Sequence, residues 1–206
     1  AALGAPDTAR EAKIATLAGE AGLARSGCAA VDITTGRTAF VRGGELFPMQ
    51  SVCKLPIAVA FLRMAQRGDK RLDAKVRLTE ADIAPGRSPL ADRLRRRPTV
   101  FTARQLLDHM LLNSDNTATD ALLKLAGGPG KVQAAIKTFG IDGLRVDRYE
   151  RDLQPQALGL EPHQSYGDPV ALEAALDALG EARKKEALAR YLRDPRDTAS
   201  PRAIVT

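Results

Sequence analysis

The chain has 206 residues, 44% of them hydrophobic, which is enough for one sizeable core or for two lobes that share a cleft, and no apolar run is long enough to span a membrane. The net charge is +6, aromatic residues make up only 4%, and a basic cluster stands at Arg93, Arg95, Arg96 and Arg97. Because no nucleic-acid-binding motif accompanies that cluster, we interpret it as a solvated basic face and expect no nucleic-acid partner.

The first fifty residues are predicted to form a helix followed by a β-hairpin. Asp7 or Thr8 can cap a helix that runs to about residue 21 with Ile14 and Leu17 on its inner face. Residues 28–34 alternate between apolar and polar side chains and predict a strand. Residues 38–42 predict the returning strand after a turn at Thr35-Gly36.

The next stretch, Gln50-Ser51-Val52-Cys53-Lys54, leads into a helix predicted over residues 55–67. Ser51 then lies at the helix N-terminus, with Lys54 on the same face. A serine nucleophile needs a nearby base to take its proton, which the amine can be. It also needs a positive dipole to stabilise the oxyanion, which the helix N-terminus supplies. Ser-x-x-Lys should occur by chance about once in a chain of this size, so alone it fits a serine helix cap equally well.

The middle of the chain is predicted to be rich in loops over residues 69–99 and helical afterwards. Thr102 and Gln105 form a capping box for a helix over residues 103–112. The triplet Ser114-Asp115-Asn116 separates this helix from an apolar helix over residues 117–125. The triplet is either a plain helix–helix turn or a loop that presents a hydroxyl and an amide into a cleft.

Beyond these helices, residues 131–139 predict another helix, and residues 149–155 are predicted to enter a loop. Residues 168–193 have a helical pattern that is broken near Gly180. Ser200-Pro201 indicates the start of a last helix. The chain ends inside that predicted helix, which leads us to expect that a C-terminal segment is missing.

The two cysteines, Cys28 and Cys53, do not have the spacing of a zinc site. We expect two buried thiols, and a bridge between them remains an open alternative. The chain begins with Ala-Ala-Leu-Gly-Ala-Pro instead of Met. That start fits a mature form after removal of a signal peptide, or an edited sequence.

Four motifs, taken in chain order, resemble those of class A serine β-lactamases. They are Ser51-x-x-Lys54, Ser114-Asp115-Asn116, Arg148-x-Glu150-x-x-Leu153-Gln154 and Arg196-Asp197-Thr198-Ala199-Ser200-Pro201. The resemblance covers nearly the whole chain. It implies an α+β fold of the serine β-lactamase and penicillin-binding-protein type, in which an all-α lobe packs on an α/β lobe whose antiparallel sheet is incomplete here. Residues 1–51 would start the α/β lobe, residues 52–197 would form the all-α lobe, and residues 198–206 would begin the next helix.

The resemblance also implies how the ring is opened. Ser51 would be the acylated nucleophile, and Lys54 would be its hydrogen-bonded partner and a possible proton acceptor. Ser114 would relay a proton to the β-lactam nitrogen. Asn116 would hydrogen-bond the amide of the substrate side chain.

Four further residues would serve the second half of the reaction by the same resemblance. Glu150 would position and deprotonate the water that hydrolyses the acyl-enzyme. Gln154, which stands where the family has Asn, would help to hold that water. Arg148 and Asp197 would form an ion pair at the neck of the Ω-loop.

The chain departs from the family pattern in three ways. Gln154 places its amide one methylene further out than Asn. The segment between Gln154 and Asp197 is several times longer, with an insertion over residues 155–196 that could be a lid, a dimer contact or a structural element. The Lys-Thr-Gly motif is absent from the printed sequence.

These observations predict a class A hydrolase of antibiotic resistance, which opens the β-lactam ring of penicillins and cephalosporins through a serine acyl-enzyme. The resemblance implies no cofactor and no metal, a monomer that a separate or missing C-terminal segment could complete, and a periplasmic or secreted setting with no membrane partner. One alternative is a penicillin-binding or sensor domain that acylates without turnover. Another is a non-catalytic fragment whose residues 168–193 form an interaction surface. If these 206 residues are the whole molecule, we expect little or no turnover.

Overall fold

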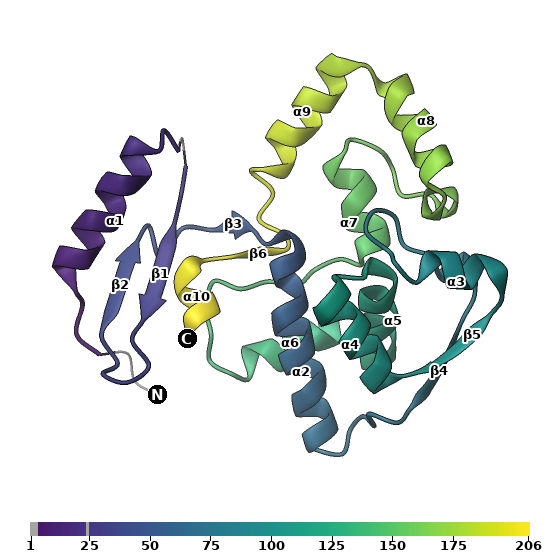
Figure 1. Ribbon diagram of the computed structural model, residues 1–206, viewed down its shortest axis with the longest axis horizontal. Coiled ribbons are helices and arrows are strands. Elements are labelled where there is room, and N and C mark those ends of the chain that lie inside the picture. The colour runs from purple at the N-terminus through teal and green to yellow at the C-terminus, as the bar shows by residue number, and fades with distance from the viewer. Residues whose placement is uncertain (1–3, 24) are drawn as a thin grey trace.

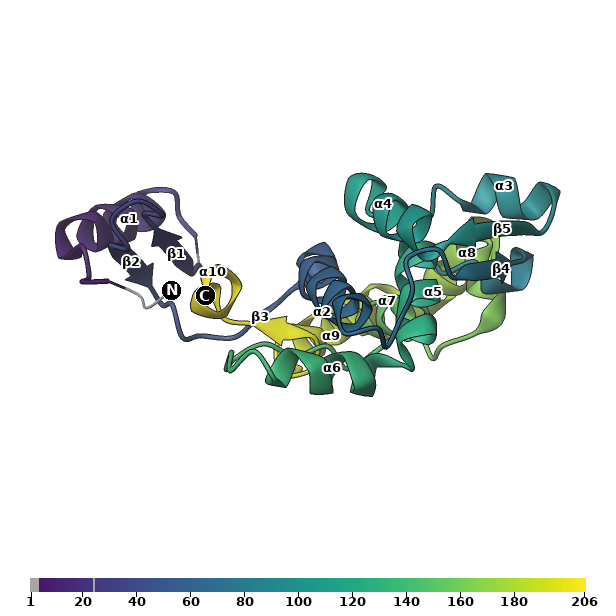
Figure 2. The same ribbon diagram turned by 90° about the horizontal axis from the view of Figure 1, so that it is seen from below.

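The computed structural model describes residues 4–23 and 25–206. An N-terminal part and a larger helical part stand side by side and are joined by two extended crossings of the chain (Figure 1). Seen from below, the N-terminal part lies apart from the helical bundle, with the crossings between them (Figure 2). The molecule therefore has the α+β composition that the sequence predicts.

The N-terminal part contains the predicted helix and hairpin. Helix α1 (Thr8–Glu20) begins at Asp7, whose side chain accepts the Arg10 N–H at 3.1 Å. Strands β1 (Cys28–Val31) and β2 (Thr38–Val41) pair antiparallel, and the short helix α10 (Pro201–Val205) contacts β1. The turn and the cap are local features, which is why the sequence pattern finds them.

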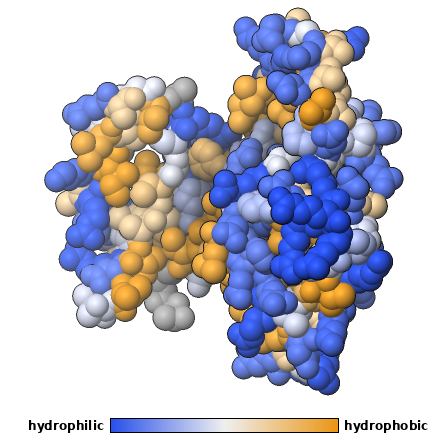
Figure 3. Space-filling view, turned by 45° about the vertical axis from the view of Figure 1, so that its right-hand side comes forward, coloured by the Kyte–Doolittle hydropathy of each residue, from blue (hydrophilic) through white to orange (hydrophobic). Residues whose placement is uncertain are grey.

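The prediction that Ile14 and Leu17 lie on the inner face is wrong for Leu17, which is 53% exposed, whereas Ile14 is partly buried. Helix α1 buries no residue completely, since it packs on a pair of only two strands. Apolar side chains are correspondingly visible on this part of the surface, at the left of Figure 3. The sequence pattern predicted the helix correctly, but it did not predict how small a surface the two strands offer for the apolar face of the helix.

The two crossings pair with each other. Strand β3 (Phe47–Pro48) pairs antiparallel with β6 (Thr198–Ala199), and Leu144 forms a further bridge to Ala199. The Met49 N–H donates to the Asp197 carbonyl at 3.0 Å. Segments from both ends of the chain therefore meet directly before Ser51.

The helical part is built around α2 (Lys54–Gln66), which the short 3-10 turn η1 (Gln50–Cys53) precedes. Three helices pack against it: α4 (Ala103–Asn113), α5 (Asn116–Ala126) and α6 (Pro129–Lys137). Their shared core is mostly aliphatic, with two buried Phe rings, Phe61 and Phe101, among the core residues. Its central members are Ile57, Phe61, Leu106, Met110, Leu122, Val132 and Ile136. The scarcity of aromatic residues in the sequence anticipates this core.

The prediction of a loop-rich segment over residues 69–99 is wrong in part. The segment contains β4 (Lys75–Leu78), the turn η2 (Glu80–Asp82) and α3 (Ala91–Arg96). Strand β4 pairs antiparallel with β5 (Thr99–Thr102) across the segment between them. Leu78 and Phe101 are buried where the two strands pair. The turn-forming residues in this segment do not predict a pairing between strands that are more than twenty residues apart.

The insertion folds as a helical pair that projects from the top of the molecule in Figure 1. Helices α8 (Pro169–Leu179) and α9 (Glu181–Tyr191) meet at Gly180, whose φ of +70° favours glycine, as the predicted break requires. The turn η3 (Gln164–Gly167) precedes α8. No described helix has the length and apolar character needed to cross a membrane.

The segment predicted to enter a loop after residue 149 is instead helix α7 (Glu150–Ala157), which continues through Pro155. No local pattern predicts this helix, because its first N–H groups bind a carboxylate thirty residues earlier in the chain, described below. Both cysteines are free thiols, which excludes the bridge. Cys53 is buried, as expected, whereas Cys28 is partly exposed.

Candidate active site

Ser51 and Lys54 lie at the start of α2. Ser51 belongs to the 3-10 turn, and Lys54 is the first residue of the α-helix, where its side chain is 97% buried. Lys54 Nζ lies 3.2 Å from Ser51 Oγ. Gln50, directly before Ser51, has a φ of +48°, a left-handed conformation that non-glycine residues adopt at a cost. The backbone therefore changes direction at Gln50, immediately before Ser51.

The Lys54 amine gathers four other side chains around one point. Besides Ser51 Oγ, Nζ lies 3.1 Å from Ser114 Oγ, 2.8 Å from Asn116 Oδ1 and 3.4 Å from Glu150 Oε1. Ser114 Oγ also donates to Ser51 Oγ at 2.9 Å. Because an ammonium has only three hydrogens, these acceptors share them, and a small shift can change which one is bound.

The triplet Ser114-Asp115-Asn116 is both a turn and a presenting loop. Ser114 ends α4 with a φ of +55°, which turns its hydroxyl toward Lys54. Buried Asp115 caps α5 by accepting the Ala118 N–H at 2.8 Å, and it also accepts the Leu90 N–H at 2.7 Å. Asn116 Nδ2 donates to the Pro85 carbonyl at 2.9 Å. The triplet is thus a helix–helix turn and, at the same time, a loop that presents a hydroxyl and an amide to Lys54.

Glu150 begins α7 and is buried against α2. Its Oε2 accepts a hydrogen bond from Gln154 Nε2 at 2.8 Å, and its Oε1 faces Lys54. Cys53 Sγ lies 4.0 Å from Oε1. Burial, reinforced by the Glu150 carboxylate, raises the pKa of the Cys53 thiol, so the thiol stays protonated and can act as a weak donor. Both carboxylate oxygens of Glu150 therefore have neighbours that can donate to them.

Asp120 supports this site and was missed by the sequence analysis. Its carboxylate accepts the Glu150 N–H at 2.6 Å, the Arg151 N–H at 3.1 Å and Arg151 Nε at 3.1 Å. It thereby caps α7 from helix α5, because α7 has no side-chain cap of its own. The available signal was a carboxylate one turn after Asn116 in an otherwise mostly apolar helix.

Burial raises the pKa of Asp120 to about 7, although the Glu150 N–H and the Arg151 side chain act in the opposite direction. Between the unfolded value of 3.8 and about 7, the folded chain then binds more protons than the unfolded chain. We therefore expect this group to stabilise the fold at low pH and to lose that contribution as pH rises through 7. The slope should not exceed about 1.4 kcal/mol per pH unit.

Urea unfolding between pH 4 and pH 8 measures this contribution when the protein is compared with Asp120→Asn. The amide keeps the shape of the carboxyl group but does not titrate. The difference between the two unfolding free energies should change across this window. Parallel curves for the two proteins would show that Asp120 does not titrate there.

The loop that carries Glu150 is closed by Arg148 and Asp197. Arg148 Nε donates to Asp197 Oδ2 at 2.6 Å, and Asp197 Oδ1 accepts the N–H groups of Asp147 at 2.7 Å and Arg148 at 3.1 Å. Arg148 Nη1 lies 3.3 Å from Asp194 Oδ2. All eight residues that the sequence singled out thus lie in one continuous region: Lys54, the five residues joined to it directly or through Glu150, and the two residues at the neck.

Chemically, this arrangement combines a serine, an amine that contacts it, a second hydroxyl and a buried carboxylate. The serine can attack a carbonyl while the amine or the second hydroxyl handles its proton. The carboxylate, held by Asp120 through its backbone and by Gln154 through Oε2, can take a proton from a water. Such a set is suited to acyl transfer through a covalent intermediate.

Comparisons with known proteins agree with this chemistry. A family model described as the beta-lactamase enzyme family matches residues 9–202. Beta-lactamase AST-1 of Nocardia asteroides is 36% identical over 156 residues, which are 76% of this chain and 49% of that protein. A beta-lactamase of Streptomyces cellulosae is 37% identical over 132 residues, 63% of this chain and 42% of that protein.

Among solved structures, an ancestral class A beta-lactamase (GNCA) matches with a TM-score of 0.68 at 28% identity. The match covers 94% of this chain and 60% of that one. The chain therefore spans about half the length of the curated relatives that it matches.

Proposed function

Because the chain belongs to the beta-lactamase enzyme family and has the fold of its class A members, we propose that it opens the ring of penicillin- and cephalosporin-type β-lactams through an acyl-enzyme on Ser51. The observation that carries the proposal is the contact of Lys54 Nζ with Ser51 Oγ, Ser114 Oγ and Glu150 Oε1 within 3.4 Å. This contact brings the groups proposed for acylation, Ser51 and Ser114, and the group proposed for deacylation, Glu150, to the same amine.

In the acylation step, Ser51 Oγ attacks the ring carbonyl and the ring C–N bond breaks. Lys54, in its neutral amine form, takes the hydroxyl proton; Ser114 gives its own proton to the ring nitrogen and regains one from Lys54, so both side chains return to their starting states. Ser114 is suited to this relay because its hydroxyl contacts both Ser51 Oγ and Lys54 Nζ. Asn116, fixed between Lys54 and the Pro85 carbonyl, can bind the amide of the substrate side chain.

In the deacylation step, the Glu150 carboxylate takes a proton from water as the oxygen attacks the ester. The ester C–O bond breaks, Glu150 gives up its proton by way of Lys54 to Ser51 Oγ, and the opened acid leaves. Asp120 and Gln154 fix the backbone and the side chain of Glu150, respectively. The proposal therefore assigns them positioning roles.

A second candidate is a penicillin-binding protein that stays acylated. The Gln154 amide occupies Glu150 Oε2 directly at 2.8 Å, while Lys54 and Cys53 lie beside Oε1. These contacts compete with a water for the carboxylate. Of the two candidates we favour turnover, because Glu150 is held by three separate elements and is close to Ser51's amine partner.

Intact-mass spectrometry after mixing the chain with benzylpenicillin tests both candidates. A transient adduct on Ser51, with opened penicillin accumulating, supports hydrolysis. An adduct that lasts for hours supports the second candidate. Ser51→Ala serves as the control and should form neither an adduct nor opened penicillin. The absence of both an adduct and opened penicillin with the unaltered chain would refute both proposals.

We also propose that the protein works as a monomer outside the cytoplasm. Class A β-lactamases are typically secreted or periplasmic, which is where their substrates arrive. Fractionation of cells that produce the protein from its natural gene tests the location, and light scattering tests the monomeric state.

A further inference from the structure

A groove of about 690 Å³ lies along helix α5, between strand β4 and the start of helix α7. One face of α5 forms part of its wall, through residues that recur at helical spacing. They are Thr117, Asp120, Ala121, Lys124 and Leu125. The volume is that of a pocket for a small organic molecule. None of the eight residues that form the candidate active site and its neck lines this groove, so the proposed chemistry does not account for it.

Positive charge reaches the groove from three elements. Four cations line it: Lys75 and Arg77 of β4, Lys124 of α5 and Arg151 of α7. Two carboxylates, Asp82 and Asp120, also line it, and both already accept backbone hydrogen bonds. Within the described part of the chain, Arg151 is the one of the four cations that has an ion-pair partner, Asp120. The groove therefore has an excess of positive charge that attracts an anion.

Arg151 is held in place by two hydrogen bonds. Its Nε donates to Asp120 Oδ2 at 3.1 Å, and its Nη2 donates to the Asp82 carbonyl at 3.0 Å. The side chain is still 41% exposed, so part of the guanidinium can be reached by a ligand. A guanidinium that is already fixed loses little conformational entropy when it binds an oxyanion.

The groove also has apolar surface among these charges. Leu78 and Ala121 are buried in its wall, Val76 and Leu125 are partly buried, and the ring of Tyr149 is partly buried as well. A ring-sized apolar group can lie on this surface while an anionic group attached to it contacts the cations. An inorganic anion by itself would leave the apolar surface uncovered.

Protection of a strand edge explains part of this charge pattern and leaves the rest unexplained. Strand β4 pairs with β5 along one edge, and no described strand pairs with its other edge. Cations on an open edge prevent pairing with another chain, which accounts for Lys75 and Arg77. It does not account for Lys124 and Arg151, which stand on helices at the same groove.

We propose that this groove is a binding site for a small organic phosphate with a ring-sized apolar body. Four cations against two carboxylates leave an excess of about two positive charges, which matches the charge of about −1.5 to −2 on a phosphate monoester at pH 7. The phosphate binds Arg151, Lys124 and Arg77, and the ring packs on the apolar wall. The site is separate from the candidate active site, so the proposal does not depend on the proposed function.

Isothermal titration calorimetry with phenyl phosphate tests the proposal, because this compound joins a phosphate to a single ring. We expect one site per chain and binding about tenfold or more tighter than that of inorganic phosphate or of phenol, each of which has one half of the recognised chemistry. No binding of phenyl phosphate, or binding no tighter than that of inorganic phosphate, would show that the cations form a solvated face and would overturn the proposal.

Two variants locate the charge that phenyl phosphate needs. Lys124→Glu and Arg77→Glu each replace a cation of the groove by an anion and should weaken binding by about tenfold or more. Both side chains are exposed, so the fold should persist, which circular dichroism checks.

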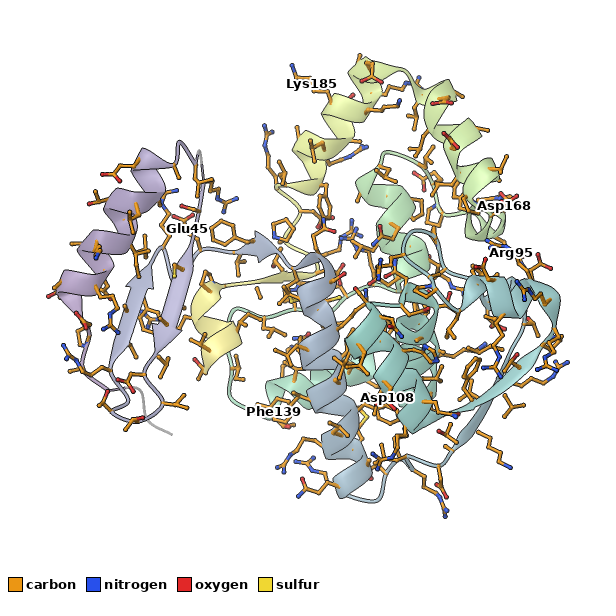
Figure 4. The ribbon with its side chains drawn as sticks, viewed as in Figure 1. Glu45, Arg95, Asp108, Phe139, Asp168 and Lys185 are labelled. Atoms are coloured by element: carbon orange, nitrogen blue, oxygen red, sulfur yellow. The ribbon has the colours of Figure 1, made fainter. Side chains whose placement is uncertain are left out.

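Lys185→Glu is the matched control, because it makes the same change of net charge at an exposed lysine of α9 that does not line the groove. Figure 4 shows Lys185 at the top of the molecule, well away from β4 and α5. This variant should bind phenyl phosphate as tightly as the unaltered chain does. Equal losses in all three variants would show a general effect of net charge and would overturn the site.

Backbone amide NMR shows where phenyl phosphate binds. The signals of Lys124, Arg151 and the residues of β4 should shift as the compound is added, and those of Ser51 and Ser114 should not. Shifts confined to the residues around Lys54 would place the compound in the candidate active site and would overturn the proposal.

Discussion

Replacing Glu150 by Gln is expected to slow release of the acyl group from Ser51 by about a thousandfold, because a positioned general base contributes roughly 10²–10⁴ to the rate of a proton-transfer step. The amide has the same shape and can still face Lys54 and Gln154. Acylation should change far less, since Ser51 keeps its contacts with Lys54 and Ser114. Rapid-quench mass spectrometry with benzylpenicillin separates the two rates.

Asp152→Asn is the matched control for that experiment, because Asp152 is another acidic residue of α7 without a contact to Lys54. It should leave both rates close to those of the unaltered chain. Equal losses of acylation and deacylation in Glu150→Gln would contradict the assignment to deacylation alone. That result would instead place Glu150, through the 3.4 Å contact with Lys54, in the removal of the Ser51 proton as well.

Replacing Asp197 by Ala should lower the free energy of unfolding by about 3–5 kcal/mol, the usual effect of removing one partner from a buried ion pair. An exposed pair would contribute only about 0–1 kcal/mol. Here the side chains of Arg148 and Asp197 are 7% and 6% exposed, so the buried case applies. The substitution would leave Arg148 buried and would remove the acceptor of two backbone N–H groups. Urea unfolding followed by circular dichroism measures the loss.

Two further variants keep this prediction testable if Asp197→Ala does not fold. Asp197→Asn retains an acceptor oxygen and suits the positive φ of +52°, so it should lose less than the alanine variant. Asp194→Ala removes the neighbouring carboxylate, whose pKa Arg196 lowers to about 2, from a more exposed pair and should also lose less. Equal losses in all three variants would show that the neck has no special role.

The sequence was most informative where structure depends on near neighbours. The cap at Asp7, the capping box of Thr102 with Gln105, and the break at Gly180 each involve residues within a few positions of one another. The pairing of β4 with β5 and the helix that follows Tyr149 were missed for the opposite reason. Strand β4 needs a partner more than twenty residues away, and α7 needs Asp120, thirty residues earlier.

The candidate site shows the same division. The motif resemblance supplied the residue types around Lys54, although Ser51 and Glu150 are about a hundred positions apart and no periodicity links them. It could not supply the contact of Gln154 with Glu150, because that depends on how far one extra methylene reaches within a folded helix.

The pairing of β3 with β6 has a consequence for how the protein forms during synthesis. Phe47 and Ala199 are about 150 residues apart, so at roughly 5–20 residues per second the first strand waits on the order of ten seconds for its partner. Arg148 waits for Asp197 in the same way, though for less time. The core around α2 can assemble in that interval from contacts that are nearer in sequence. Closure of the crossings, and with it the fixing of the loop that carries Glu150, belongs to the late and slow part of folding.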